Sequence, residues 1–294
     1  MSVSPELLAA EAHGTPRSRL ASAVAMPRLA LAGGLLLLVI VVLGAGAPLF
    51  THWGSTQIDF NAIDTAPGAH GHLLGTDMNG MDVWARTLYG ARIDLGVAIA
   101  SVAIALAIGG VLGGLIGYLG GWIDELGMRV MDVIQSFPAF VLALVVAAVF
   151  GRSLADLIVV LAAVSAPSYV RVMRAEVRST RELGFVEAAR SAGESSSSIL
   201  LRHVIPNSLR PLFVIAPLNC GWSILTLAGL SFLGLGVSLP TAEWGAMISG
   251  GTDDLVQNHW WPSIVPGVAL FLSVLAFNLL GEGVLDARAR NKPQ

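Results

Sequence analysis

The sequence predicts an all-α membrane protein with six transmembrane helices. Of its 294 residues, 54% are hydrophobic and only 13% are charged, and the mean hydropathy is +0.72. These values lie far outside the range of water-soluble domains of this length. The apolar residues form long runs, and most arginines flank alternate runs. We therefore expect contact with membrane lipid and no nucleic-acid partner.

The transmembrane helices are predicted from apolar runs of about 20 residues, the length that crosses about 30 Å of hydrocarbon. Six runs qualify or come close: 29–50, 95–119, 133–150, 154–172, 211–236 and 263–283. They leave an N-terminal tail (1–28), an outer loop (51–94), a core of five helices (95–283) and a C-terminal tail (284–294). The first run is longer than a signal peptide's apolar region and follows a long polar leader, so we expect a retained anchor.

The orientation follows from the positively charged residues. Fourteen arginines and lysines flank one side of the predicted spans, including seven between 171 and 210, against Arg86, Arg92 and Arg152 on the other side. The cytoplasmic side of a membrane protein carries this excess, so both termini and the segment 173–210 are expected in the cytoplasm. The outer loop is acidic instead.

Two features inside the spans bear on packing and transport. Gly109, Gly113 and Gly117 form a smooth helix face, which can pack within this chain or against a partner subunit. Pro138 lies in the third run and permits a kink. The central portions of the spans hold no ionisable side chain, whereas ion-driven carriers normally place one there, so energy for transport is expected from elsewhere.

The cytoplasmic segment contains a predicted amphipathic helix that ends at Gly193. Apolar residues recur at helical spacing in two sets, Leu183, Val186 and Ala189, and Phe185, Ala188 and Ala192. On the pattern alone, this helix can equally be an ordinary surface helix or one that lies on lipid headgroups.

The order of residues in this segment carries a resemblance to a known family. Glu187-Ala188-Ala189 is followed after three residues by Gly193, and after nine more by His203-Val204-Ile205-Pro206. This pattern resembles the EAA loop of binding-protein-dependent ABC importer permeases of the dipeptide, oligopeptide and nickel type. His203 and Ile205 depart from the family's usual Ile-x-Leu-Pro ending.

Further matches extend the resemblance over most of the chain and point to the second, C-type permease subunit. They are 73–77, Gly80, Asp82, Arg86, 89–92, 120–124, 231–236, 243–245, 277–283 and Asp286. Met81 and Asp94 stand where the family usually has arginine and serine.

The resemblance implies a type I ABC importer permease fold in the bacterial cytoplasmic membrane, without catalytic activity. It implies a homologous permease partner, two ATP-binding subunits that hold ATP and magnesium, and an extracytoplasmic substrate-binding protein. Peptides are the expected cargo, with nickel or another small solute as the alternative. Coupling to the ATP-binding subunit is assigned to Phe185, Glu187, Ala188, Ala189, Ala192, Gly193 and Pro206. Asp77 and Asp82 are candidate receptor contacts, with a role in folding the loop as the alternative.

Other function classes are weaker. A self-sufficient carrier or channel lacks charged mid-membrane residues and an evident inverted repeat. A membrane enzyme with a metal site could use His70 and His72, with His52 and His259, but loop histidines are more often ordinary polar residues. The only lysine is Lys292, which excludes a Walker A loop, and the only cysteine is Cys220, which excludes a disulfide within the chain.

Overall fold

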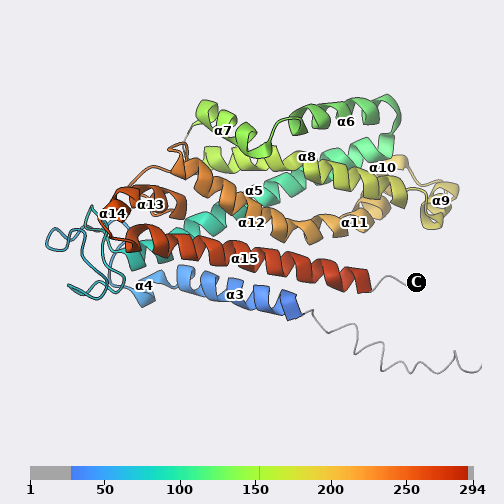
Figure 1. Ribbon diagram of the computed structural model, residues 1–294. Helices are drawn as coiled ribbons and strands as arrows, with labels where there is room; N and C mark the ends of the chain where they lie inside the picture. The colour runs from blue at the N-terminus through green and yellow to red at the C-terminus, as the bar shows by residue number, and fades with distance from the viewer. Residues whose placement is uncertain (1–27, 152, 291–294) are drawn as a thin grey trace, which may run out of the picture.

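The computed structural model describes residues 28–151 and 153–290, and Figure 1 shows a bundle of long helices. Residues 1–27 of the predicted tail 1–28, Arg152 and residues 291–294, with Lys292, lie outside the described residues. Within the described residues the regular secondary structure is helical, apart from two isolated bridges in the outer loop. The helices are α3 (Arg28–Ala45), α4 (Ala47–Phe50), α5 (Val83–Leu119), α6 (Gly121–Gln135), α7 (Ala139–Phe150), α8 (Leu154–Thr180), α9 (Gly184–Ser191), α10 (Ser196–Ile199), a π-helical turn (Leu200–Val204), α11 (Ile205–Ser208), α12 (Arg210–Phe232), α13 (Trp244–Gly250), α14 (Thr252–Val256) and α15 (Trp261–Arg290).

In the part of the chain that the structure describes, five helices are long and apolar enough to cross a membrane: α3, α5, α8, α12 and α15. A sixth span exists if α6 and α7 are counted together, although they meet at an angle of 87°. The predicted span 133–150 is therefore not one straight helix. Pro138 lies at the break, where it supplies no N–H and disfavours helical geometry in the residue before it.

Helix boundaries also differ from the predicted spans. α5 begins at Val83 rather than near residue 95, because Asp82 caps its first turn by accepting the N–H of Ala85. The irregular outer loop is correspondingly shorter, ending at Asp82. α8 continues to Thr180, past the predicted end at 172, and α12 ends at Phe232, before the predicted 236.

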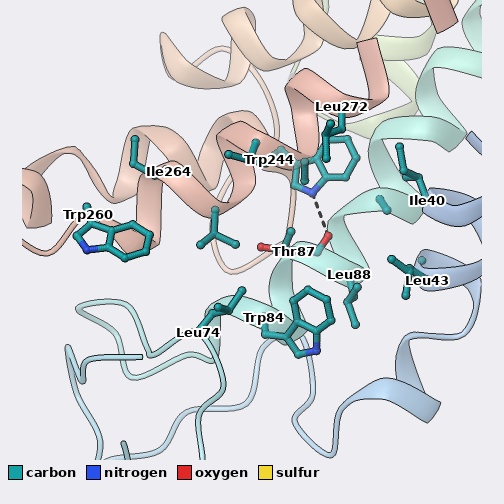
Figure 2. A pocket seen from close by; sticks show the side chains of 15 residues that line it. Ile40, Leu43, Leu74, Trp84, Thr87, Leu88, Trp244, Trp260, Ile264 and Leu272 are labelled. Carbon is teal, nitrogen blue, oxygen red and sulfur yellow. Dashed lines mark hydrogen bonds between the residues drawn. The ribbon is translucent and has the colours of Figure 1, made fainter. Parts of the chain in front are cut away.

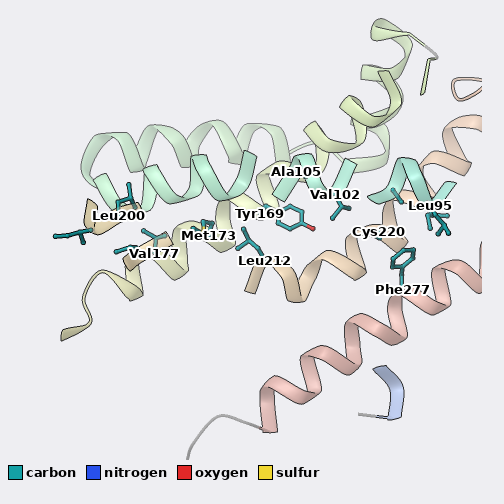
Figure 3. Close-up of a cluster of buried hydrophobic side chains, with 14 of the residues drawn as sticks. Leu95, Val102, Ala105, Tyr169, Met173, Val177, Leu200, Leu212, Cys220 and Phe277 are labelled. Carbon is teal, nitrogen blue, oxygen red and sulfur yellow. The ribbon is translucent and has the colours of Figure 1, made fainter. Parts of the chain in front are cut away.

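The core is built around the contact between α5 and α8. Gly109 lies against Tyr169, Gly113 against Val170, and Gly117 against Arg174, so closely that a Cβ atom on any of the three would overlap α8. The smooth glycine face thus packs within the chain, the first of the two alternatives. Figure 3 shows the buried cluster that these helices share with α12 and α15, including Met173, Leu212, Cys220 and Phe277.

The end of the bundle that carries the outer loop is closed by α13. Trp244 is buried and donates from Nε1 to the carbonyl of Thr87 at 3.0 Å. Asp94, at a position where the resembling permeases carry serine, is fully buried and accepts the backbone N–H of Trp244 at 3.2 Å. These contacts fix α13 against α5.

Candidate functional site

The loop between α8 and α12 carries α9, which protrudes at the end of the bundle opposite the outer loop (Figure 1). Arg181 ties the end of α8 to the end of α5 by donating to the carbonyls of Gly117 and Tyr118, each at 3.2 Å. α9 therefore starts from a fixed base.

One face of α9 anchors it to the bundle. Val186 is fully buried and belongs to the same apolar cluster as Val177 of α8 and Val204 of the π-helical turn. Ala189 packs partly against this cluster. α9 is therefore packed against the end of α8 and against the π-helical turn that leads toward α12.

The opposite face of α9 is open. Phe185 is 43% exposed, which is unusual for an aromatic side chain on a short helix that has a core to pack against. Ala188 and Ala192 are exposed beside it at helical spacing, and Glu187 lies in the first turn, where the helix dipole favours a negative charge. Small residues beside an exposed aromatic one allow another protein surface to approach closely.

Gly193 ends α9 in the way the sequence predicts. Its φ of +82° lies in the left-handed region, which favours glycine. The N–H of Gly193 bonds to the carbonyl of Arg190 and the N–H of Glu194 to that of Ala189, the pair of bonds that defines a Schellman cap. The chain turns back sharply after α9 as a result.

Glu194 holds the segment that follows the turn at Gly193, which comprises α10 and the π-helical turn. Its carboxylate accepts hydrogen bonds from Ser198 Oγ at 2.6 Å and from His203 Nε2 at 2.9 Å. The Ser198 bond, followed by that of His203, lowers the pKa of Glu194. His203, a departure from the family pattern, thus has a local partner. Pro206 lies in α11 and is exposed there, so it does not belong to the open face of α9.

The two candidate receptor contacts lie in the outer loop and have partners within it. Asp82 is 1% exposed and accepts hydrogen bonds from the Ala85 N–H at 2.6 Å and from His72 Nδ1 at 2.8 Å. Asp77 accepts the N–H groups of Asn79 and Met81, and burial raises its pKa. This geometry favours the alternative role, in folding the loop.

The histidines considered for a metal are not brought together. His72 is buried, stacks on Trp53 at 4.4 Å between ring centroids, and hydrogen-bonds Asp82, whereas His70 is exposed. Among the residues that the structure describes, no group of three or more histidine, cysteine, aspartate or glutamate side chains is placed to hold a metal ion.

An apolar pocket of about 340 Å³ lies between α3, α5 and α15 (Figure 2). Its lining includes Trp84, Leu88, Trp244 and Ile264, and it holds no charged side chain. A solute site normally adds a few polar groups that orient the ligand. This pocket therefore suits an apolar group rather than a charged or strongly polar solute.

The comparison with known proteins decides the family. Residues 109–291, more than half of the chain, match the family described as binding-protein-dependent transport system inner membrane component. The chain belongs to this family. This ABC importer permease is 39% identical over 260 residues to the glutathione transport system permease protein GsiD of Pectobacterium atrosepticum, which covers 88% of this chain and 85% of that protein. The protein of the same name from Escherichia coli is 38% identical over 265 residues, with the same coverage.

The family and the helices together establish an all-α, multi-pass inner-membrane permease, a transport subunit rather than an enzyme. A crystal structure of an amino acid ABC transporter with histidines aligns with 69% of this permease and 94% of that chain, at 18% identity and a TM-score of 0.49. The assignment rests on the family rather than on that likeness.

Proposed function

We propose that this permease forms half of the route for a peptide-like solute and that α9 is the element by which ATP-binding subunits move it. A homologous permease supplies the other half of the route, and a receptor outside the membrane delivers the solute. ATP and magnesium bind to the partner subunits. Both termini and α9 face the cytoplasm in this arrangement.

The observation that carries the coupling role is the two-sided character of α9. Val186 anchors one side in the bundle, while Phe185 and Ala188 are exposed on the other. A partner can shift a conformational equilibrium only through contacts that differ between the two states. A short helix that is anchored on one side and open on the other transmits such contacts to α8 and α12.

The solute class is supported by the relatives. The similar permeases from Pectobacterium atrosepticum and Escherichia coli are named for glutathione transport, and glutathione is peptide-like. We infer that the cargo carries peptide bonds and free ionised ends. Nickel or another small solute is the alternative. For the receptor, we place the contact on the surface around Asp77 rather than on Asp82, whose side chain is buried.

Photo-crosslinking tests the coupling contact. Ala188→Cys, in a Cys220→Ala background, is labelled with a maleimide photo-crosslinker in membranes that contain the complete importer. We expect a crosslink to the ATP-binding subunit. The control is Arg190→Cys, which is exposed on the opposite side of α9. Equal crosslinking at the two positions, or none at 188, would contradict the docking proposal.

Uptake by the complete importer in proteoliposomes tests the solute class. Radiolabelled glutathione and a labelled dipeptide are compared with nickel in the presence of the cognate receptor. Uptake of a peptide-like solute that depends on ATP supports the proposal. Uptake of nickel alone would replace it with the metal alternative.

A further inference from the structure

Successive residues of a helix are rotated by about 100° around its axis, and the residues of α6 sort in this way into three faces of different character. The first face packs on the bundle, where Gly127 lies against Ile116 and where Met131 joins a buried cluster with Val170. Asp124, on the same face, binds Arg174 of α8. This face fixes how the helix is turned relative to the rest of the chain.

The second face is charged and exposed. Glu125, Arg129, Asp132 and Ser136 follow one another at spacings of four, three and four residues, so they lie in one row. Glu125 and Arg129 pair at 3.7 Å with side chains 73% and 74% exposed. We call this row, with Arg171 of α8, the polar strip.

Arg171 extends the row onto the neighbouring helix. Its Nη2 lies 2.8 Å from Oδ1 of Asp132, and the two side chains are 48% and 57% exposed. Further along, Gln135 Nε2 donates to Ser168 Oγ at 3.4 Å. The charges of the polar strip alternate in sign and sum to zero.

The third face of α6 is apolar and also exposed. Its members are Trp122, Leu126, Val130 and Val133, and the exposed Phe137 follows just after the helix. One helix thus offers a charged surface and an apolar surface side by side, and none of the described residues covers either of them. Charged side chains in a membrane bundle face water or another polar group, whereas apolar ones face lipid or a packed neighbour. The two surfaces must therefore meet different surroundings.

The polar strip runs along the bundle rather than across its end. Asp132 is eleven residues from the start of α6, or about 16 Å along the helix at 1.5 Å per residue. Arg171 is nine residues before the end of α8, or about 14 Å. Both helices run side by side in Figure 1, so the strip rises from the end that carries α9 well into the bundle.

We propose that the polar strip lines the half of the translocation route next to α9 and contacts a solute that carries both an ammonium and a carboxylate group. This inference rests on the proposed import function and deepens it. Alternating charges let a zwitterion exchange partners step by step without being trapped, because neither sign dominates. A route for a divalent cation would instead be expected to show an excess of carboxylates.

Cysteine labelling in membranes tests the lining without any need for transport. In a Cys220→Ala background, Arg129→Cys and Ser136→Cys are compared with Val130→Cys, using a membrane-impermeant maleimide in inside-out vesicles that hold the complete importer. Only a hydrated cysteine ionises and reacts readily. We expect labelling at 129 and 136 to be at least about tenfold faster. Similar rates on both faces, or no labelling at 129 and 136 because the partner permease covers them, would overturn the proposal.

A second measurement separates the strip from the coupling function. Asp132→Asn combined with Arg171→Gln removes both charges and leaves an uncharged polar side chain at each position. We expect receptor-stimulated ATP hydrolysis to stay within about twofold, while the number of zwitterionic peptides transported per ATP falls at least about fivefold. Unchanged transport, or a parallel loss of transport and ATP hydrolysis, would overturn the role in the route. The coupling proposal fails on a different result: substitutions in α9 that leave receptor-stimulated ATP hydrolysis intact.

Discussion

Arg174 of α8 donates to Asp124 of α6 through both Nε and Nη2, the latter at 2.7 Å, and so joins two helices fifty residues apart in sequence. Arg178 adds a third bond to the same carboxylate at 3.2 Å. The cluster lies where α5, α6 and α8 meet, close to the start of α9. It ties the base of the coupling loop to the helix that carries the polar strip.

Asp124→Ala is expected to destabilise the protein by about 1–3 kcal/mol, because two arginines lose a charged hydrogen-bond partner. The thermal unfolding midpoint in detergent measures the change. Glu125→Ala is the matched control: its side chain is 73% exposed, and an exposed pair contributes within about 0.5 kcal/mol. An equal effect of the two substitutions would show that the Asp124 cluster stabilises the protein no more than an exposed ion pair does.

Gly109→Ala and Gly113→Ala are expected to weaken the contact between α5 and α8. Each added Cβ atom would overlap backbone or Cβ atoms of α8, and overpacking of this kind costs about 1–3 kcal/mol. Gly96→Ala, on the same helix, meets no atom within 4 Å. Thermal unfolding of the three variants should separate the first two from the control, and a neutral Gly109→Ala would contradict the close contact.

Glu194→Gln is expected to remove a pH-dependent support of the coupling loop. The pKa of Glu194 is lowered in the folded state by the Ser198 and His203 bonds. The stabilisation is therefore complete above the unfolded pKa of about 4.3 and is lost as the pH falls through the lower folded pKa. Hydrogen exchange in α10 should accelerate in the wild type over that interval, after correction for intrinsic rates.

In Glu194→Gln the same exchange should already be a few fold faster at pH 7 and should show less dependence on pH. Glu182→Gln, an exposed glutamate before α9, serves as the control. A wild-type loop whose protection does not change at low pH would refute the role of this carboxylate.

Asp254→Asn is expected to stabilise the outer end of the bundle at neutral pH. Asp254 is 1% exposed and both carboxylate oxygens lack a hydrogen-bond partner among the described residues. Burial, and then the charges of Asp64 and Asp77, raise its pKa. A raised pKa means that the folded state binds the proton more tightly, so wild-type stability falls as the pH rises above about 4.

The asparagine variant should unfold at a temperature a few degrees above wild type at pH 7, and this difference should vanish toward pH 4. Asp253, exposed on the same first turn of α14, is the control: Asp253→Asn should leave the unfolding temperature unchanged at both pH 7 and pH 4. A lower midpoint for Asp254→Asn at pH 7 would mean that the buried carboxylate has a partner that stabilises it.

The sequence was sufficient for the features that depend on local pattern. Apolar runs located the five long helices, the helical spacing of two sets of apolar residues predicted α9 as an amphipathic helix, and Gly193 predicted its end. These features could be predicted because each depends on residues that are close together in sequence: an apolar run, a helical repeat, or a single glycine that adopts the left-handed conformation.

Features that depend on contacts distant in sequence were not predictable in the same way. The early start of α5 depends on Asp82, whose carboxylate is oriented by His72 from ten residues upstream. The 87° bend at Pro138 was suggested only as a possible kink, because proline alone does not determine the angle. The roles of Asp124 and Asp132 depend on arginines of α8 that lie about forty to fifty residues further on.

Receptor-stimulated ATP hydrolysis by the complete importer, measured for Glu187→Arg and Gly193→Trp, tests the coupling role of α9 most directly. Both substitutions alter the exposed side or the end of α9 and leave Val186 in its buried place, so membrane insertion should persist. We expect stimulated hydrolysis and transport to fall at least about tenfold, whereas Glu182→Arg, a charge reversal at an exposed glutamate before α9, should remain within about twofold of wild type. Full stimulated hydrolysis in both α9 variants would contradict the claim that a nucleotide-driven partner moves this permease through that helix.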